Sequence, residues 1–122
     1  MASAENIIIN GILLKAADFN SILFRNSVGL FKTTKGNKIR TGLCKGSSDL
    51  IGWTSIEIAE DLISIFTAVE VKTKKARITK EQRNFLNAVN DSGGIGMIVY
   101  NVKEYEILMS QSIQAIKHQK NL

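Results

Sequence analysis

The amino-acid sequence predicts an α/β domain in which helices flank a mixed β-sheet, in the order α-β-β-β-α-β-α. Along the chain, the spacing of apolar residues changes from the helical period of about 3.6 to the strand period of about 2 and back again. Residues that start and stop helices separate these segments. Such an arrangement predicts helices packed on the faces of a sheet. The length predicts a single domain, residues 1–122.

The first third of the chain predicts a helix, a turn and a short buried strand. Residues 4–17 form the helix, and Ser3 is a suitable N-cap. A turn at residues 18–21 leads into a strand at residues 22–25. Residues 26–48 hold four glycines, so at most a short strand or two is expected there. The inner stripe expected for the helix consists of Ile7, Ile8, Gly11, Ile12 and Leu14.

The middle of the chain predicts the two central strands. Residues 50–53 form one of them, and an exposed connection follows between about residues 53 and 63, marked by acidic residues. Residues 64–73 form the other strand and alternate most clearly. Because successive side chains of a strand point to opposite faces, Glu70 and Lys72 must share one face. A carboxylate and an ammonium are therefore neighbours on a strand otherwise suited to burial.

The last third predicts a helix, a strand and a second helix. Thr79 and Gln82 have the spacing of a capping box, and Gly93-Gly94 ends the helix that they start. A strand at residues 96–100 follows, and then a helix over residues 101–117. The expected inner stripe of this last helix consists of Val102, Tyr105, Leu108, Met109, Ile113 and Ile116.

The basic residues are segregated along the chain. The net charge is +5, and no acid lies between Asp18 and Asp49 or within residues 71–80. These two windows contain eleven of the sixteen Lys and Arg residues. Segregated positive charge favours a polyanionic partner over a merely solvated basic loop. The basic residues are Arg25, Lys32, Lys35, Lys38, Arg40 and Lys45, then Lys72, Lys74, Lys75, Arg77 and Lys80.

Other residue types narrow the class of protein. Cys44 is the only cysteine, which excludes an intramolecular disulfide and a thiolate metal cage within one chain. The simplest interpretation is a buried or idle thiol in a reducing cytosol. His118 lies in a polar tail and is expected to be solvated. The N-terminal segment has no basic n-region, and no apolar run reaches about 18 residues, so we expect neither a signal peptide nor a membrane span.

Asp49, Glu70 and Lys72 form the candidate site. If residues 50–53 pair with residues 64–73, Asp49 and Glu70 meet at the end away from the turn. Two carboxylates there would repel unless a cation lay between them, and a hard divalent ion with oxygen ligands would fit. Lys72 would then hold a water or neutralise charge on a phosphate, as phosphodiester hydrolysis requires.

Plainer interpretations compete at each position. Glu70 and Lys72 alone are typical of a surface cross-strand pair. Gln82 suits a capping box as well as a site, and Glu5 suits the N-terminus of a helix through the helix dipole. Trp53 is better explained by core or loop packing than by base stacking.

Three stretches together resemble the virus-type replication-repair nuclease (VRR-NUC) domain of the PD-(D/E)xK nuclease superfamily. They are KGSSDLIGW, FTAVEVKTKKARITKEQRNFL and GGIGMIVY, and their order and spacing make the resemblance specific. The resemblance covers the chain from about Glu5 to the last helix. It implies a restriction-endonuclease-like core.

The resemblance also implies roles for individual residues. Asp49 and Glu70 would bind the divalent metal, Mg²⁺ or Mn²⁺, with the Val71 carbonyl as a third ligand. Lys72 matches the catalytic lysine, Gln82 the glutamine that reaches toward the site, and Glu5 the acid of the first helix. Arg25-Asn26 resembles a substrate-side element. Lys45 replaces a frequent proline, and its charge would contact phosphate.

The expected function is a metal-dependent, structure-specific DNA endonuclease that acts as a homodimer on four-way (Holliday) junctions. The basic residues Lys74, Lys75, Arg77 and Lys80 would grip DNA beside the site. A phage-encoded protein would work in the host cytoplasm. The alternatives are a flap or nicking nuclease, a restriction-like nuclease, and a non-catalytic DNA-binding module.

Overall fold

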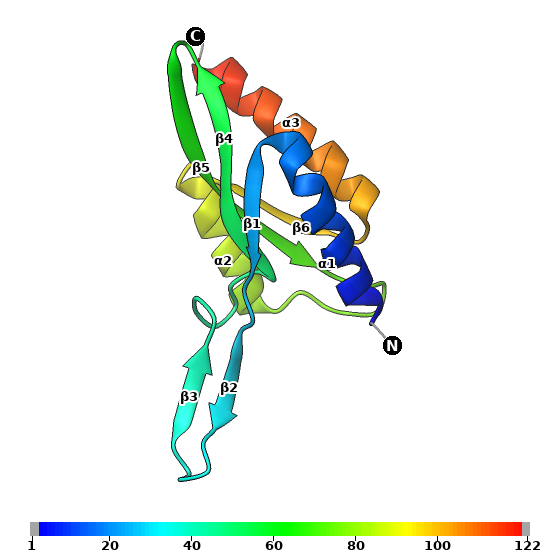
Figure 1. Ribbon diagram of the computed structural model, residues 1–122, viewed down its shortest axis with the longest axis vertical. Coiled ribbons are helices and arrows are strands. Elements are labelled where there is room, and N and C mark those ends of the chain that lie inside the picture. The colour runs from blue at the N-terminus through cyan, green and yellow to red at the C-terminus, as the bar shows by residue number, and fades with distance from the viewer. Residues whose placement is uncertain (1–2, 121–122) are drawn as a thin grey trace.

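A four-stranded mixed sheet with helices on both faces forms the body of the protein, and a two-stranded hairpin projects from it (Figure 1). The computed structural model describes residues 3–120. The elements are α1 (Ala4–Lys15), the 3₁₀ turn η1 (Ala16–Phe19), β1 (Ser21–Arg25), β2 (Gly29–Lys32), β3 (Lys38–Thr41), β4 (Leu50–Ile58), β5 (Asp61–Val71), α2 (Lys80–Asp91), β6 (Ile95–Val99) and α3 (Val102–Lys120). The predicted fold class is confirmed, with the β2–β3 hairpin added to the predicted order.

The central sheet has the strand order β1-β4-β5-β6. β4 pairs antiparallel with β1 and β5, and β5 pairs parallel with β6 across the connection that contains α2. β5 is therefore an inner strand. Its last five residues, 67–71, are all buried, including the charged Glu70.

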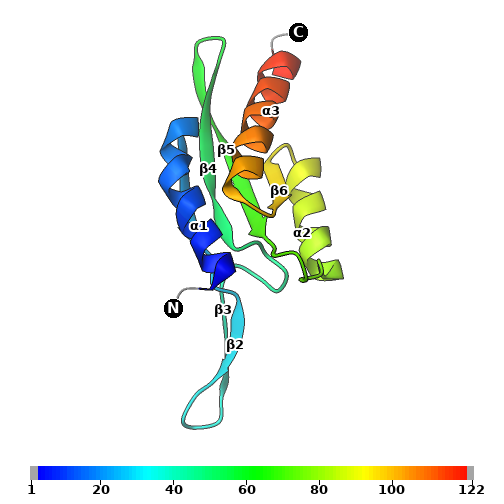
Figure 2. The same cartoon turned by 90° about the vertical axis from the view of Figure 1, so that its right-hand side faces the viewer.

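Helices cover the two faces of this sheet unequally (Figure 2). α1 and α3 pack together on one face, where Ile12, Tyr105 and Met109 meet Leu50 and Val69 in the main core. The predicted inner stripe of α3 is confirmed, since each of its members is buried or half-buried. α2 lies on the other face in a smaller cluster that includes Leu86, Val89 and Ala68. No helix within residues 3–120 combines the length and the apolar character needed to cross a membrane.

The predicted inner stripe of α1 is partly wrong. Ile9, Ile12 and Ala16 face the core, whereas Ile7 and Leu14 are exposed. Apolar residues surround most of this helix, so periodicity alone does not specify which side packs on the sheet. The sequence pattern therefore does not distinguish the exposed Ile7 and Leu14 from the residues that pack on the sheet.

The exposed connection predicted between residues 53 and 63 is also wrong. β4 continues to Ile58 and β5 begins at Asp61, so only Ala59 and Glu60 form the turn. Ile56 and Ile58 point inward, and Glu57 lies on the exposed side of the same strand. An acidic residue on the outer face of a half-buried strand is compatible with pairing. Trp53 lies on that outer face beside Phe24, with ring centroids 5.8 Å apart, and so occupies neither core nor loop.

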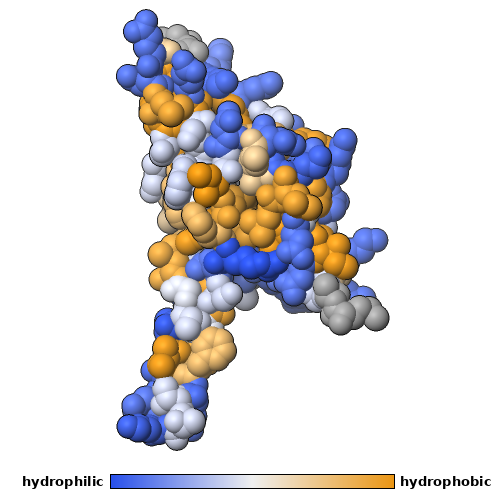
Figure 3. Space-filling model, viewed as in Figure 1, coloured by the Kyte–Doolittle hydropathy of each residue, from blue (hydrophilic) through white to orange (hydrophobic). Residues whose placement is uncertain are grey.

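Residues 26–48 contain the projecting hairpin, which we call the arm. β2 and β3 pair only with each other, so the expectation of a short strand or two is confirmed. The arm leaves the body where β1 ends and β4 begins, near the N-terminus of α1 and opposite the β4–β5 turn (Figure 1). Its tip is hydrophilic and apolar residues lie nearer its base (Figure 3).

Candidate active site

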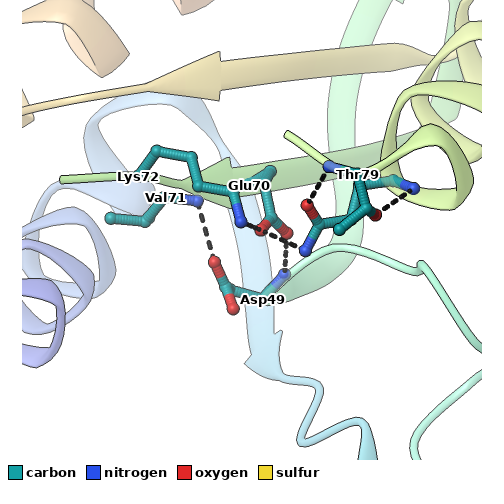
Figure 4. A network of polar contacts seen from close by, with 6 residues as sticks. Asp49, Glu70, Val71, Lys72 and Thr79 are labelled. Carbon is teal, nitrogen blue, oxygen red and sulfur yellow. Dashed lines mark hydrogen bonds and ion pairs between the residues drawn. The ribbon is translucent and has the colours of Figure 1, made fainter. Parts of the chain in front are cut away.

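Asp49 and Glu70 lie together at the end of the β4–β5 hairpin, as the sequence predicts. The register pairs Leu50 with Val69, so the next residue of each strand is an acid. The Asp49 backbone N–H donates to Glu70 Oε1 at 3.2 Å, and the Val71 N–H donates to Asp49 Oδ2 at 2.8 Å. These bonds hold each carboxylate against the backbone of the opposite strand (Figure 4).

Asn26 fixes the loop that presents Asp49. Its side-chain amide donates to Ser47 Oγ at 2.7 Å and to the Ser48 carbonyl at 2.8 Å, and its Oδ1 accepts from the Leu43 N–H. The Asn26 backbone N–H donates to the Asp49 carbonyl at 2.8 Å. The residue after β1 therefore positions the residue before β4 through four hydrogen bonds.

Two glycines of the same motif allow the close packing around Asp49. Gly46 has φ of +85°, and a Cβ there would lie 2.6 Å from the carbonyl carbon of Glu81 in α2. A Cβ on Gly52 would lie 1.8 Å from the carbonyl oxygen of Ile22 in β1. No side chain fits at either position without displacing backbone, which explains the glycines of GSSDLIG in physical terms.

Glu70 is a buried carboxylate with a polar partner on each oxygen. It is 2% exposed, and its Oε2 accepts from Gln82 Nε2 at 3.1 Å and lies 3.3 Å from Lys72 Nζ. Burial, and after it the charge of Asp49, raises the pKa of Glu70 to about 7, although Lys72 opposes the shift. The pair of Glu70 and Lys72 is thus buried, which excludes the interpretation as a surface ion pair.

The other two acids of the region are also perturbed. Burial raises the pKa of Asp49, although the Val71 N–H and Lys72 oppose the shift. Burial and the nearby Asp49 raise the pKa of Glu5, which lies in the first turn of α1. Burial is the first cause of all three shifts, and a cluster of desolvated carboxylates with raised pKa values is typical of a functional site.

Gln82 performs both of the roles that the sequence leaves open. Its Oε1 accepts from the Thr79 N–H at 3.0 Å and Thr79 Oγ1 accepts from its N–H at 3.1 Å, which completes the capping box of α2. Its Nε2 is left free to bond Glu70. The amide has one acceptor and one donor end, so the cap and the site use different atoms.

A cavity of about 370 Å³ opens over these residues. Its lining includes Glu5, Arg25, Asp49, Glu70 and Gln82. A larger groove of about 620 Å³, lined by residues of β5, α2 and α3, contains no titratable side chain. The three carboxylates with raised pKa values all line the smaller, polar cavity.

The donor set fits a hard divalent cation. Within residues 3–120, no three Asp, Glu, His or Cys side chains are close enough to form a metal site by themselves. Two carboxylates are present, and no hydrogen bond from the described residues occupies Asp49 Oδ1. The Val71 N–H points to Asp49, while the Lys72 N–H points to Val99 of β6. Since the N–H and C=O of one strand residue point the same way, the Val71 carbonyl also faces Asp49 and would supply a third oxygen.

The residues predicted to contact nucleic acid differ in their accessibility. The exposed ones are Lys74, Lys75, Arg77 and Lys80, which lie on or beside the loop after β5. Lys45 is also exposed, and its Nζ lies 3.9 Å from Glu81 Oε1. Asn26 is buried and its amide is committed to the Asp49 loop, so its geometry favours positioning over contact with DNA.

Two asparagines that were not predicted as site residues hold the side chain of Arg25. This side chain lines the cavity and donates to Asn6 Oδ1 at 3.4 Å and to Asn10 Oδ1. Asn6 and Asn10 lie one turn apart on α1, and Asn6 lines the cavity together with Glu5. Two asparagines at i and i+4 in an otherwise apolar helix were the signal that could have identified them.

One known domain family matches the part of the chain that contains most of this site. The model of the VRR-NUC domain matches residues 28–104, which is more than half of the 122-residue chain. The match contains Asp49, Glu70, Lys72 and Gln82 and leaves out Glu5, Arg25 and Asn26. No curated protein and no solved structure matches the chain. On the family match, the chain belongs to the VRR-NUC domain family, a nuclease family with a restriction-endonuclease-like fold.

Proposed function

We propose that the protein is a divalent-metal-dependent endonuclease that hydrolyses phosphodiester bonds of branched DNA. The family supports a nuclease-type function on DNA. The observation that carries the metal dependence is the adjacent pair of carboxylates beside Lys72, with Glu70 2% exposed and Asp49 half-buried. Buried like charges are costly without a compensating cation, and one ammonium cannot neutralise both.

Each residue of the site has a stated role in this proposal. Asp49, Glu70 and the Val71 carbonyl would hold Mg²⁺ or Mn²⁺. When bound, such an ion lowers the pKa of a water and polarises a phosphoryl oxygen. Lys72 supplies a fixed ammonium for the negative charge that develops on the phosphate. Gln82 keeps Glu70 oriented while it caps α2.

Cleavage of a synthetic four-way junction tests the chemistry. We expect the parent protein to cut with Mg²⁺ or Mn²⁺ and not with EDTA. Asp49→Ala and Lys72→Ala should each lower the rate by at least about a hundredfold, because each removes a charge next to the reacting phosphate. Asp61→Ala and Lys15→Ala are matched controls, since both residues are exposed and lie away from the site. Cutting that persists in EDTA or survives both site variants would refute this mechanism.

Substrate choice separates the remaining alternatives. The exposed cations beside the site suit contacts to phosphates, which carry no sequence information, so DNA structure is the better candidate for what is recognised. Junction, flap, nicked and plain duplex substrates should be compared at equal concentration. Preference for a flap or nick, or sequence-dependent cutting of plain duplex, would replace the junction proposal. DNA binding without cleavage, unchanged in Glu70→Ala, would favour a non-catalytic binding module.

We also propose that the active form is a homodimer, because two symmetric cuts in a junction need two active sites. The apolar stripe of α3 is packed in the core and is not available for pairing. A second copy would cover the sheet face that α2 leaves open, where Ile22, Phe24, Trp53 and Phe66 are each at least 39% exposed. Trp53→Lys should shift the protein to a monomer in sedimentation, whereas Leu14→Lys on α1 should not. The opposite result would place the interface on α1.

A further inference from the structure

Hydrogen bonds within the arm hold its shape, and its apolar side chains are not buried against the body. Within its turn, the Thr33 N–H donates to the Asn37 carbonyl at 2.7 Å, and Thr33 Oγ1 accepts from the Asn37 N–H at 3.0 Å. Leu30, Phe31 and Ile39 are each more than half exposed. An isolated two-stranded hairpin is only marginally stable in water, so a projecting arm of this kind needs an explanation.

The two faces of the arm differ in chemistry. The register pairs Leu30 with Arg40, Phe31 with Ile39, and Lys32 with Lys38. Cross-strand partners share a face and neighbours along a strand do not. One face therefore carries Lys32, Lys38 and Arg40 together with Leu30, and the opposite face carries Phe31 and Ile39.

The positive charges of the basic face destabilise the pairing of the two strands of the arm. Like charges directly opposite each other on paired strands are destabilising, and Lys32 faces Lys38. Among the residues that the structure describes, the two ion pairs are Lys45–Glu81 and Lys72–Glu70, so the arm's cations have no acidic partner. Lys35 in the turn adds to the same charge. Only an anion from outside the chain would offset this repulsion.

The position and size of the arm fit duplex DNA. The arm projects from the end of the body at which β4 begins (Figure 1), and Asp49 directly precedes that strand. Each of its four-residue strands spans roughly 13 Å at about 3.3 Å per residue, and the major groove, about 12 Å wide, admits a two-stranded ribbon. We propose that the arm is a DNA-binding ribbon whose basic face contacts phosphates of the duplex beside the cut site. The choice of DNA as the polyanion rests on the proposed function.

Salt-dependent binding of a labelled four-way junction, measured by fluorescence anisotropy in EDTA, tests the arm. Each phosphate contact contributes about 0.9 to the slope of log K against log salt. Lys32→Ala/Lys38→Ala should therefore lower that slope by about 2 and weaken binding roughly tenfold at low salt. Lys15→Ala/Lys117→Ala is the charge-matched control and should retain the parent slope.

The outcomes distinguish a failure of the arm proposal from a failure of the proposed nuclease function. If the parent cuts DNA and the arm variant keeps the parent slope, the arm proposal is wrong and the nuclease stands. If the arm variant lowers the slope but the parent never cuts, the arm stands and the nuclease is wrong. Equal losses in the control would show a net-charge effect and overturn the arm. An unchanged slope together with loss of the dimer in Phe31→Ser/Ile39→Ser would assign the arm to a second copy instead.

Discussion

The two sheets of this protein are held together by different means. The four-stranded sheet is covered by α1 and α3 on one face and partly by α2 on the other, and Leu50 and Val69 are fully buried within it. The arm has the same backbone pairing, but no helix covers it and its apolar residues are exposed. The stability of the fold therefore resides in the body, and the arm adds charged surface without adding to the core. Substitutions of packed residues in the body should change folding, whereas substitutions in the arm should leave it nearly unchanged.

The largest test of this separation compares two leucines. Leu50→Ala in β4 should lower the free energy of unfolding by about 2–5 kcal/mol, because it leaves a cavity in the core. Leu30→Ala in β2 should change it by less than about 0.5 kcal/mol, since the Leu30 side chain is 54% exposed. Urea denaturation of both variants measures this difference. Equal losses would show that the arm is part of the folded core.

Glu70 provides the next test, through the pH dependence of stability. Its pKa is raised from 4.5 to about 7, so between these values the folded protein binds more protons than the unfolded chain. Stability of the metal-free protein should therefore fall as pH rises through this range, by on the order of 2–3 kcal/mol. Glu70→Gln should remove most of the dependence, and the arm variant Lys32→Ala/Lys38→Ala should retain it. A flat profile in the parent would mean that Glu70 is ionised throughout.

The smallest test compares two threonines that each accept a backbone N–H. Thr79 caps α2 in the body, and Thr33 closes the turn of the arm. Thr79→Ala should cost about 1 kcal/mol as a lost N-cap. Thr33→Ala should cost less than about 0.5 kcal/mol in thermal unfolding, because local opening of the arm leaves the body intact. A larger loss for Thr33→Ala would indicate that the arm and the body unfold together.

The sequence predicts the pairing of the central strands better than the packed face of α1 or the length of β4. Alternation along residues 64–73 and the hairpin pairing place Asp49 beside Glu70, because strand geometry relates position to face directly. The face of α1 is not predictable in this way, since Ile7 and Leu14 are as apolar as the residues that pack. The extent of β4 is missed because Glu57 resembles a loop residue when its inward neighbours are not considered together.

The site is predicted less completely than the strands. Its charged residues interrupt apolar runs and are visible in the sequence for that reason. The positioning residues are not, because Asn26, Ser47 and Gly46 resemble ordinary turn residues. Their hydrogen bonds join segments about twenty residues apart, and no local pattern encodes such contacts. The choice between cap and site at Gln82 could not be made either, because it depends on the orientation of one amide.

The hydrogen bonds made by Asn26 also determine how freely the length of the arm can change. They join residue 26 to residues 47 and 48, so the chain that forms the arm begins and ends at points that are already held together. The entropy of closing a flexible loop changes by only about 0.6 kcal/mol when its length is halved or doubled. The segment between these anchors can therefore be shortened or lengthened at little cost in folding free energy. In thermodynamic terms the arm is an insertion whose length the fold leaves almost unconstrained.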